Sequence, residues 1–397
     1  MSVEYVGRSA ERRARARARL RAQDVSLLQR MDWILFGAVA ALAGYGLYLI
    51  AGITDHDVDG SPQYFLIRQA LFALVGLAGL GAALLVDPDW YRRLWRPIYV
   101  GTVLVMFFVS LAGPVTRGSR RWLDLGFFTF QPSEFGKLLF VLALAGFLAE
   151  RSRRLNEPRT TGTLLGLAAL PLLLVYVQPD FGTALVYAAA LAALLFVAGV
   201  RWLNVAVVGA LTVLTAAAVL WALPAAGVHV LKEYQLQRIT GFMHPDTDPS
   251  GATYNVSQSK VAVGAGGFDG RGVRNATQTN LDYLPEHATD FVFASLAEQR
   301  GFVGASILLC LYLLVVWRGL RVITVARDMY SAVVAGGIVF AFLFQIFVNV
   351  GMTMGIAPIT GIPLPFVSVG GSSMIANLLA MGVLLSIHLR GTPMRRR

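Results

Sequence analysis

Two acids and a histidine lie close together in a short polar stretch that precedes an apolar run. They are Glu286, His287 and Asp290. A carboxylate held where water becomes scarce suits a general base, which takes a proton from a reacting hydroxyl. We predict this role for Asp290 and a substrate-binding role for Glu286 and His287. The alternative is that Thr289 or Asp290 only caps the helix that follows.

A second polar cluster combines basic residues with an acid at the start of another apolar run. Arg120 and Arg121 precede it, and Glu134 and Lys137 open it. We predict that Lys137, with Arg120 or Arg121, faces an anionic headgroup and that Glu134 takes part in the same site. Glu134 and Lys137 are three residues apart and share a helix face, so the alternative is a private ion pair that lets both enter the bilayer.

Two further clusters stand at interruptions between apolar runs. Asp180 lies in a Pro-Asp-Phe-Gly turn, where it either binds substrate or caps the next helix. Ser372 and Ser373 follow a glycine pair at the start of the last run, where a helix N-terminus favours phosphate and simple capping is the alternative. Trp122 is expected at the edge of the substrate site as an interfacial anchor. Ser133 is expected to cap the helix that Glu134 opens.

The elements that must position these residues are membrane helices. The chain has 397 residues, of which 56% are hydrophobic and 14% charged, and its mean hydropathy is +0.61. A soluble domain carries about a quarter charged residues. Apolar runs of about 20 residues, the length that spans a hydrocarbon core, recur along the chain. We predict an all-α membrane protein with about ten spans: 33–53, 66–86, 97–114, 134–149, 163–177, 182–199, 203–223, 302–317, 331–350 and 372–389.

Arginine placement orients these spans. Arginines crowd both ends of the chain, so both termini are predicted to be cytoplasmic by the positive-inside rule. We divide the chain into an Arg-rich tail (1–31), a membrane domain (32–391) and a basic tail (392–397). A polar segment at about 225–300 forms a large loop outside, between the seventh and eighth spans. The four polar clusters then all reach the outer face.

Several other functions are disfavoured by the sequence. The basic amino-terminal arm is better explained as a cytoplasmic tail than as a nucleic-acid-binding segment. The sequence contains no P-loop, so a nucleotide cofactor is not expected. Its five histidines show no zinc spacing, and its one cysteine, Cys310, allows no disulfide within the chain.

At the polar clusters the sequence resembles the SEDS family (shape, elongation, division and sporulation proteins), which are multi-span peptidoglycan glycosyltransferases. The sequences Thr277-Gln278 and Phe130-Gln131-Pro132-Ser133 are more similar to the elongation member RodA than to the division member FtsW. The stretches that carry the resemblance, in the family's order, are Arg121-Trp122-Leu123-Asp124, Gln131-Pro132-Ser133-Glu134, Gln178-Pro179-Asp180-Phe181-Gly182-Thr183, Leu284-Pro285-Glu286-His287, Thr289-Asp290-Phe291, Gly361-Ile362-Pro363-Leu364-Pro365-Phe366 and Gly370-Gly371-Ser372-Ser373.

The resemblance implies ten spans, a large outer loop after the seventh, and a catalytic aspartate in the Thr-Asp-Phe motif, here Asp290. It also implies a class B penicillin-binding protein as partner, together with other membrane proteins of an elongation complex. The sequence departs from the family at Ala288, where a histidine is usual. If that histidine tunes the aspartate, His287 must replace it or the site works without it.

The expected reaction is the polymerisation of lipid II into glycan strands at the outer face of a bacterial cytoplasmic membrane. It would be an inverting transfer, assisted by a divalent cation, Mg²⁺ or Mn²⁺, held by Glu134, Asp180 or Glu286. The alternative is a lipid II flippase. A carrier should place polar clusters at both faces, and here they gather at one.

Overall fold

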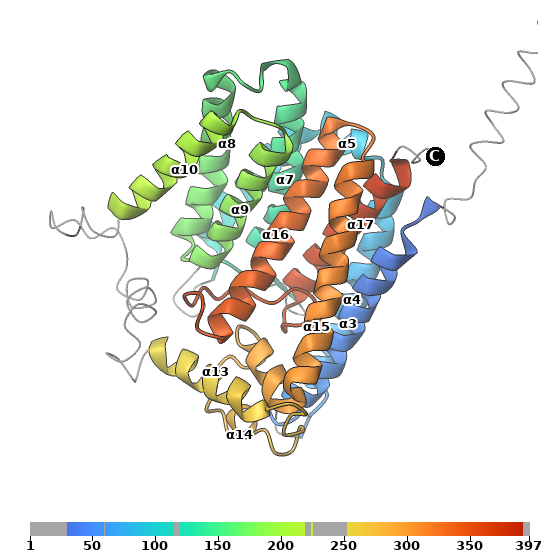
Figure 1. Ribbon diagram of the computed structural model, residues 1–397, viewed down its shortest axis with the longest axis vertical. Helices are drawn as coiled ribbons and strands as arrows, with labels where there is room; N and C mark the ends of the chain where they lie inside the picture. Colours follow the sequence, from blue (N-terminus) through green and yellow to red (C-terminus); the bar gives the residue numbers. More distant parts are fainter. Residues whose placement is uncertain are drawn as a thin grey trace, which may run out of the picture.

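The computed structural model describes residues 30–58, 60–114, 120–124, 126, 128–218, 224 and 252–391, and these form a helical bundle (Figure 1). The two predicted tails and the first part of the 225–300 loop lie almost entirely outside the described residues. The α-helices are α3 (Trp33–Ile53), α4 (Tyr64–Leu85), α5 (Pro88–Arg93), α6 (Trp95–Ala112), α7 (Pro132–Glu150), α8 (Pro158–Val177), α9 (Phe181–Val197), α10 (Trp202–Ala217), α13 (Ala252–Gly266), α14 (Thr277–Asn280), α15 (Val292–Val325), α16 (Met329–Thr353) and α17 (Gly371–Arg390).

The predicted fold class is confirmed. Eight of the described helices are long and apolar enough to cross a membrane, and the shorter apolar helices α9 and α10 coincide with two further predicted spans. Helices are expected here because a lipid environment leaves main-chain polar groups no partners outside the segment. One boundary was wrong: α15 begins at Val292, ten residues before the predicted span, and bends at Gly301.

Three helices form the centre of the bundle. The apolar windows of α7, α16 and α17 are 78%, 72% and 78% buried, whereas those of α4 and α6 are each 22% buried. The outer helices expose large apolar side chains such as Leu74 on α4 and Phe108 on α6. In a membrane these faces contact lipid, so the polar residues of the central helices are kept inside the protein.

One end of the bundle is built from short elements and loops. In Figure 1, α13 and α14 lie across the lower end, below α15 and α16. A small hairpin, β1 (Leu123–Asp124) and β2 (Thr129–Phe130), precedes α7, and Ser372 of α17 donates to the Thr129 carbonyl oxygen at its edge. The segment 267–291, which contains the short helix α14, connects α13 to α15. This end therefore gathers the segments in which the sequence placed its polar clusters.

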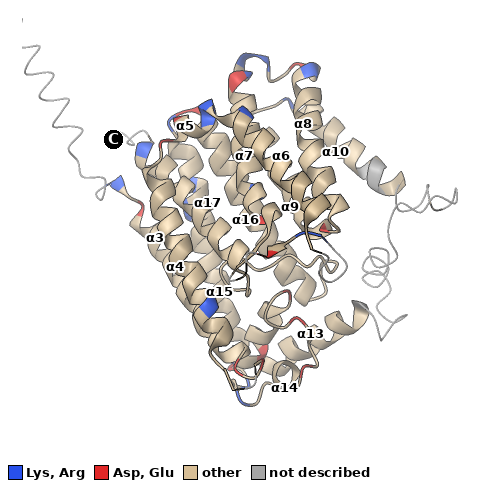
Figure 2. Ribbon diagram, turned by 180° about the vertical axis from the view of Figure 1, so that it is seen from behind, with Lys and Arg blue, Asp and Glu red and all other residues tan. Residues whose placement is uncertain are grey.

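Basic residues mark the opposite end. Figure 2 shows lysine and arginine gathered around α5 and the connection between α7 and α8. The positive-inside rule assigns such an end to the cytoplasm, so the orientation stays a prediction.

Gly301 allows the bend in α15. Its φ of 63° and ψ of −161° are open essentially to glycine alone. A Cβ here would lie 2.4 Å from the Gly270 nitrogen and 2.5 Å from the Phe268 oxygen. The bend therefore permits close contact between α15 and the loop that follows α13.

We expect Gly301→Ala to lower the stability of the detergent-solubilised protein by at least about 1–3 kcal/mol, because the alanine is both strained and crowded. Thermal unfolding measures this. Gly37→Ala is the matched control, because a Cβ at that helical glycine has no neighbour within 4 Å. Equal unfolding midpoints for both variants would contradict the role given to the bend.

Candidate active site

A cavity of about 740 Å³ lies where α7, α9 and α17 begin and where the loops 281–291 and 354–370 meet. It receives residues from all four polar clusters of the sequence. The lining residues are Arg121, Trp122, Thr129, Gln131, Glu134, Pro179, Asp180, Thr183, Glu286, Thr289, Asp290, Thr360, Gly361, Pro363, Val369, Gly370, Gly371, Ser372 and Ser373.

Asp180 organises one wall of the cavity. Its carboxylate caps α9 by accepting from the Thr183 main-chain nitrogen at 3.2 Å. It also accepts from Gln131 Nε2 at 3.0 Å and from Ser133 Oγ at 3.3 Å. Arg121 lies 3.9 Å away as an ion-pair partner. Asp180 thus both caps a helix and lines the cavity. The predicted cap by Ser133 was wrong, since Gln131 holds the N-cap position of α7.

Arg121 is the only lysine or arginine among the described residues that line the cavity. Its guanidinium carbon lies 4.1 Å from the centre of the Trp122 ring. The tryptophan therefore stabilises the Arg121 cation in addition to lining the cavity. Its Nε is buried with no hydrogen-bond partner in the described part of the chain. Arg120 instead is exposed and donates to the Leu111 carbonyl oxygen at 2.9 Å, away from the lining.

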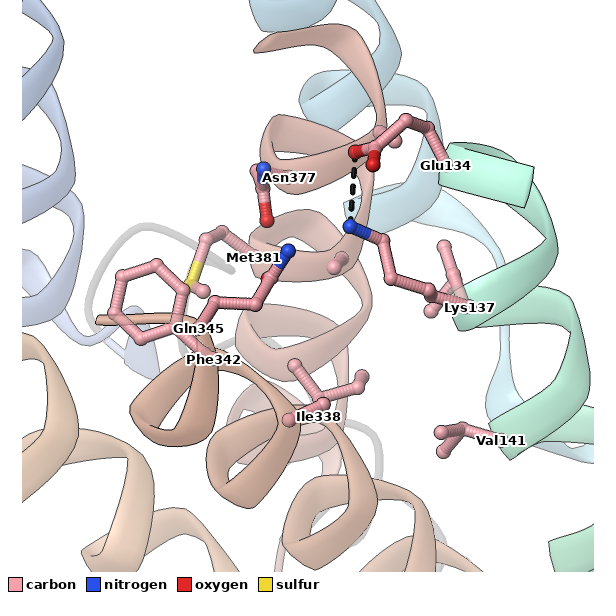
Figure 3. A pocket seen from close by; sticks show the side chains of 12 residues that line it. Glu134, Lys137, Val141, Ile338, Phe342, Gln345, Asn377 and Met381 are labelled. Atoms are coloured by element: carbon pink, nitrogen blue, oxygen red, sulfur yellow. Dashed lines mark hydrogen bonds and ion pairs between the residues drawn. The ribbon is translucent and has the colours of Figure 1, made fainter. Parts of the chain in front are cut away.

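Glu134 and Lys137 form the ion pair that their spacing predicted. Lys137 Nζ lies 2.9 Å from Glu134 Oε2, and the Glu134 side chain is 2% exposed. Figure 3 shows both on α7, with Lys137 pointing toward Gln345 and Asn377. These residues line a smaller pocket of about 30 Å³, enough for about two water molecules. Glu134 lines both pockets, so Lys137 lies behind it as seen from the cavity.

Asp290 and Glu286 come from the loop that precedes α15. Glu286 has a φ of 59°, unusual for a residue with a side chain, and its Oε2 accepts from Thr289 Oγ1 at 2.8 Å. Phe291 is the N-cap residue of α15, and no side chain caps this helix. The capping alternative for Thr289 and Asp290 is therefore not seen, and both line the cavity.

His287 turns away from the cavity. Its Nε2 lies 3.0 Å from Asp57 Oδ1 in the loop between α3 and α4, and its Nδ1 lies 3.3 Å from the Leu284 carbonyl oxygen. Burial disfavours the charged ring. The hydrogen bond and charge of Asp57, with Asp282 and the Leu284 carbonyl, outweigh burial and raise the pKa of His287. The histidine therefore ties two loops together.

One of the two serines at the start of α17 binds this helix to the hairpin. Ser372 Oγ donates to the Thr129 carbonyl oxygen at 2.9 Å and accepts from the Gln131 nitrogen at 2.9 Å. Ser373 Oγ accepts from Asn377 Nδ2 at 3.2 Å. Gly370 is the N-cap residue and no side chain caps α17. Both serines line the cavity without capping the helix.

Of the predicted site residues, the cavity thus brings together eight and leaves out Arg120, Lys137 and His287. Gln131 and Thr183 also line it. Sequence reasoning assigned neither of them a role, although both stand inside the quoted motifs. No three His, Cys, Asp or Glu side chains in the described residues converge as a metal site.

Comparison with known proteins decides the family. Residues 29–392 match the family described as "Cell cycle protein" (FTSW_RODA_SPOVE). The chain belongs to this family. It is 40% identical to peptidoglycan glycosyltransferase MrdB of Escherichia coli K12, over 90% of this chain and 93% of that protein. It is 36% identical to stage V sporulation protein E of Bacillus subtilis 168, over 84% and 89% of the two chains.

Solved structures of the family agree. One is a chain of a peptidoglycan synthase complex whose structure concerns the coordination of polymerisation and crosslinking. It has a TM-score of 0.76 at 29% identity, covering 90% of this chain and 97% of that one. The Thermus thermophilus rod shape determining protein RodA has a TM-score of 0.64 at 26% identity, covering 90% and 96%. The resemblance predicted from the motifs is confirmed.

The buried ion pair on α7 predicts an asymmetric response to substitution. Lys137→Met leaves the Glu134 carboxylate buried without its cation, which we expect to cost about 3–5 kcal/mol. Glu134→Gln combined with Lys137→Met removes both charges and should recover most of that loss. Thermal unfolding in detergent compares the two. A double variant as unstable as the single one would contradict the pairing.

The tie between His287 and Asp57 predicts a stability that depends on pH. Because the folded pKa of His287 lies above its ordinary value of 6.5, the charged ring stabilises the fold fully below that value, and the contribution is lost as pH rises through the folded pKa. Asp57→Asn should therefore destabilise the protein more at about pH 6 than at about pH 9. His56→Ala, an exposed histidine of the same loop, is the control and should change neither value. A pH-independent effect of Asp57→Asn would refute the tie.

Proposed function

We propose that this chain is a peptidoglycan glycosyltransferase that polymerises lipid II during cell elongation. The observation that carries the proposal is a single cavity in which Asp290, Arg121, Asp180 and Glu134 meet, although they come from separate parts of the chain. Relatives at 36–40% identity include proteins named for this activity.

Asp290 is the general base. Joining two sugars requires that the acceptor 4-hydroxyl lose its proton as its oxygen attacks the donor's anomeric carbon. A positioned base contributes roughly 10²–10⁴-fold to such a step. Asp290 takes that proton, the bond to the pyrophosphate breaks on the opposite side of the carbon, and the anomeric configuration inverts.

Arg121 is the cation that meets the departing pyrophosphate. The cavity wall carries four carboxylates and one guanidinium among its described residues, so an added pyrophosphate needs more positive charge. Lys137 can supply some of it only by leaving Glu134. If the Glu134–Lys137 pair were purely structural, the double variant would recover polymerisation together with stability, and the proposal requires that it does not.

A divalent cation, Mg²⁺ or Mn²⁺, fits the same shortage of positive charge. Magnesium that shares its coordination with substrate phosphates needs only one or two protein carboxylates, so the lack of a three-ligand cluster among the described residues is compatible with it. We assign it to Glu134 and Asp180, on the wall beside Arg121. When bound, it would neutralise charge on the pyrophosphate.

The proposed setting is the cytoplasmic membrane of a bacterium, with both termini inside and the cavity on the outer face. The polyprenyl tail of lipid II lies between helices while its headgroup occupies the cavity. A class B penicillin-binding protein that cross-links the new strands is the proposed partner, alongside other membrane proteins of the elongation complex. The likeness to a chain of a synthase complex supports this partnership.

Asp290→Asn tests the proposal. We expect this variant to insert and to bind the penicillin-binding partner normally, yet to form glycan from lipid II at least about 10²-fold more slowly, because an amide cannot accept the proton. The rate of glycan formation is measured in proteoliposomes that are given lipid II on the outer side, with the glycan products separated by length on gels. The wild-type reaction should also stop with a chelator and resume with Mg²⁺ or Mn²⁺.

Two outcomes would contradict the proposal. Normal polymerisation by Asp290→Asn would remove Asp290 from the chemistry. Movement of lipid II across the bilayer by the wild type, with no polymer formed, would instead support a flippase.

A further inference from the structure

Consecutive main-chain carbonyls of the loop that carries Asp290 are each bound by a different donor. Ser295 Oγ binds the carbonyl of His287 at 3.2 Å, and the Val369 nitrogen binds that of Ala288 at 2.9 Å. The next two carbonyls accept from side chains outside this loop: Ser368 Oγ donates to Thr289 O and Asn349 Nδ2 donates to Asp290 O at 2.9 Å.

The two side-chain donors are deeply buried. Ser368 is 3% exposed and Asn349 is 0% exposed. Asn349 Nδ2 donates at the same time to the Ile362 carbonyl oxygen at 2.8 Å, and Ser368 Oγ accepts from the Leu364 nitrogen at 2.8 Å. A buried carbonyl that loses its donor is left without the hydrogen bond that water would have supplied, so these bonds are strongly favoured. Each donor therefore joins the Asp290 loop to the loop 354–370.

The loop 354–370 is itself fixed from two other helices. Gln69 of α4, 1% exposed, donates to the Ser368 carbonyl oxygen at 3.1 Å and accepts from the Gly370 nitrogen at 3.1 Å. Tyr312 of α15 donates its hydroxyl proton to the Pro365 carbonyl oxygen. The donors that hold Asp290 thus stand on a rigid support.

We propose that Asn349 and Ser368 are positioning residues that set where the Asp290 carboxylate stands in the cavity. This inference rests on the proposed function. The position of the Asp290 carboxylate depends on the position of its main chain. The hydrogen bonds to the adjacent carbonyls of residues 289 and 290 fix the direction of that main chain. A displacement of about 1 Å in a reacting group can cost about 10²-fold in rate. Neither side chain lines the cavity, so both act through Asp290 and not on substrate.

Asn349→Leu and Ser368→Ala test this inference in the full-length protein with its partner. Asn349→Leu keeps the branched shape of the side chain and replaces the amide by two methyl groups, which cannot donate, and Ser368→Ala removes only the hydroxyl. We expect kcat for lipid II polymerisation to fall between about 10- and 100-fold, with KM changed by less than about two-fold, because substrate contacts are untouched. A loss of folded protein would also lower the apparent kcat at constant KM, so each kcat is expressed per folded molecule.

Two further variants separate positioning from general stability. Ser386→Ala removes a similar buried bond, from Ser386 Oγ to the Val86 carbonyl oxygen at 2.7 Å, at the opposite end of the bundle, and should leave kcat unchanged. Ser368→Thr keeps the hydroxyl and should restore most of the rate lost in Ser368→Ala. Thermal unfolding of every variant corrects for the folded fraction.

The inference is overturned if Asn349→Leu and Ser368→Ala keep the wild-type kcat, or if their losses match the drop in folded protein. It is also overturned if Ser368→Thr is no faster than Ser368→Ala. Failure of the proposed function looks different, because the wild type would then make no polymer or Asp290→Asn would make it normally.

Discussion

A charged or main-chain polar group inside a membrane bundle needs a partner, and this requirement governs the architecture of the site. In lipid, an unsatisfied group costs several kcal/mol, and the protein must supply what water supplies elsewhere. Asp180 meets this need with four neighbours drawn from three segments. The partners that make the carboxylate tolerable also join α7 and α9 to the segment that carries Arg121. The contacts that satisfy the Asp180 charge are therefore the same contacts that assemble the cavity wall.

The same requirement operates at the other end of the bundle. Asp32 caps α3 and accepts two hydrogen bonds from Arg318 of α15, at 2.9 and 2.7 Å. Arg390 of α17 donates to the carbonyl oxygens of Leu84 and Leu85 at the end of α4. These contacts join helices directly. At the cavity end the polar contacts run through loops, and the cavity lies between the helix ends.

Local spacing and hydropathy predict much of this structure because the forces involved act over short stretches. An apolar run of about 20 residues specifies a membrane helix whatever surrounds it, so the spans were found, although the start of α15 was placed ten residues too late. The pairing of Glu134 with Lys137 follows from a separation of three residues on one helix. The motifs also identified the loops whose residues line the cavity.

Contacts between distant segments were beyond such reasoning. The predicted polar loop ran to about residue 300, so the first turns of α15 were assigned to that loop. Nothing local reveals that the Glu298 carboxylate accepts from the main-chain nitrogens of Gln278 and Thr279 and from the Thr279 hydroxyl. The position of Lys137 behind Glu134 depends on how α7 packs against α16 and α17. The bonds from Asn349 and Ser368 to the Asp290 loop join residues 59 and 79 positions apart. Only the folded chain brings these groups together.

The alanine at position 288 illustrates how the surroundings decide what a residue can do. Ala288 is 9% exposed and packs within the main apolar core, while its carbonyl accepts from the Val369 nitrogen. The imidazole stands one position earlier, at His287, and its ring bonds to Asp57 and Leu284. Because main-chain donors and buried amides set the course of the loop, Asp290 can be placed by its backbone. A histidine that packed or polarised it from position 288 is then replaceable by a small apolar side chain.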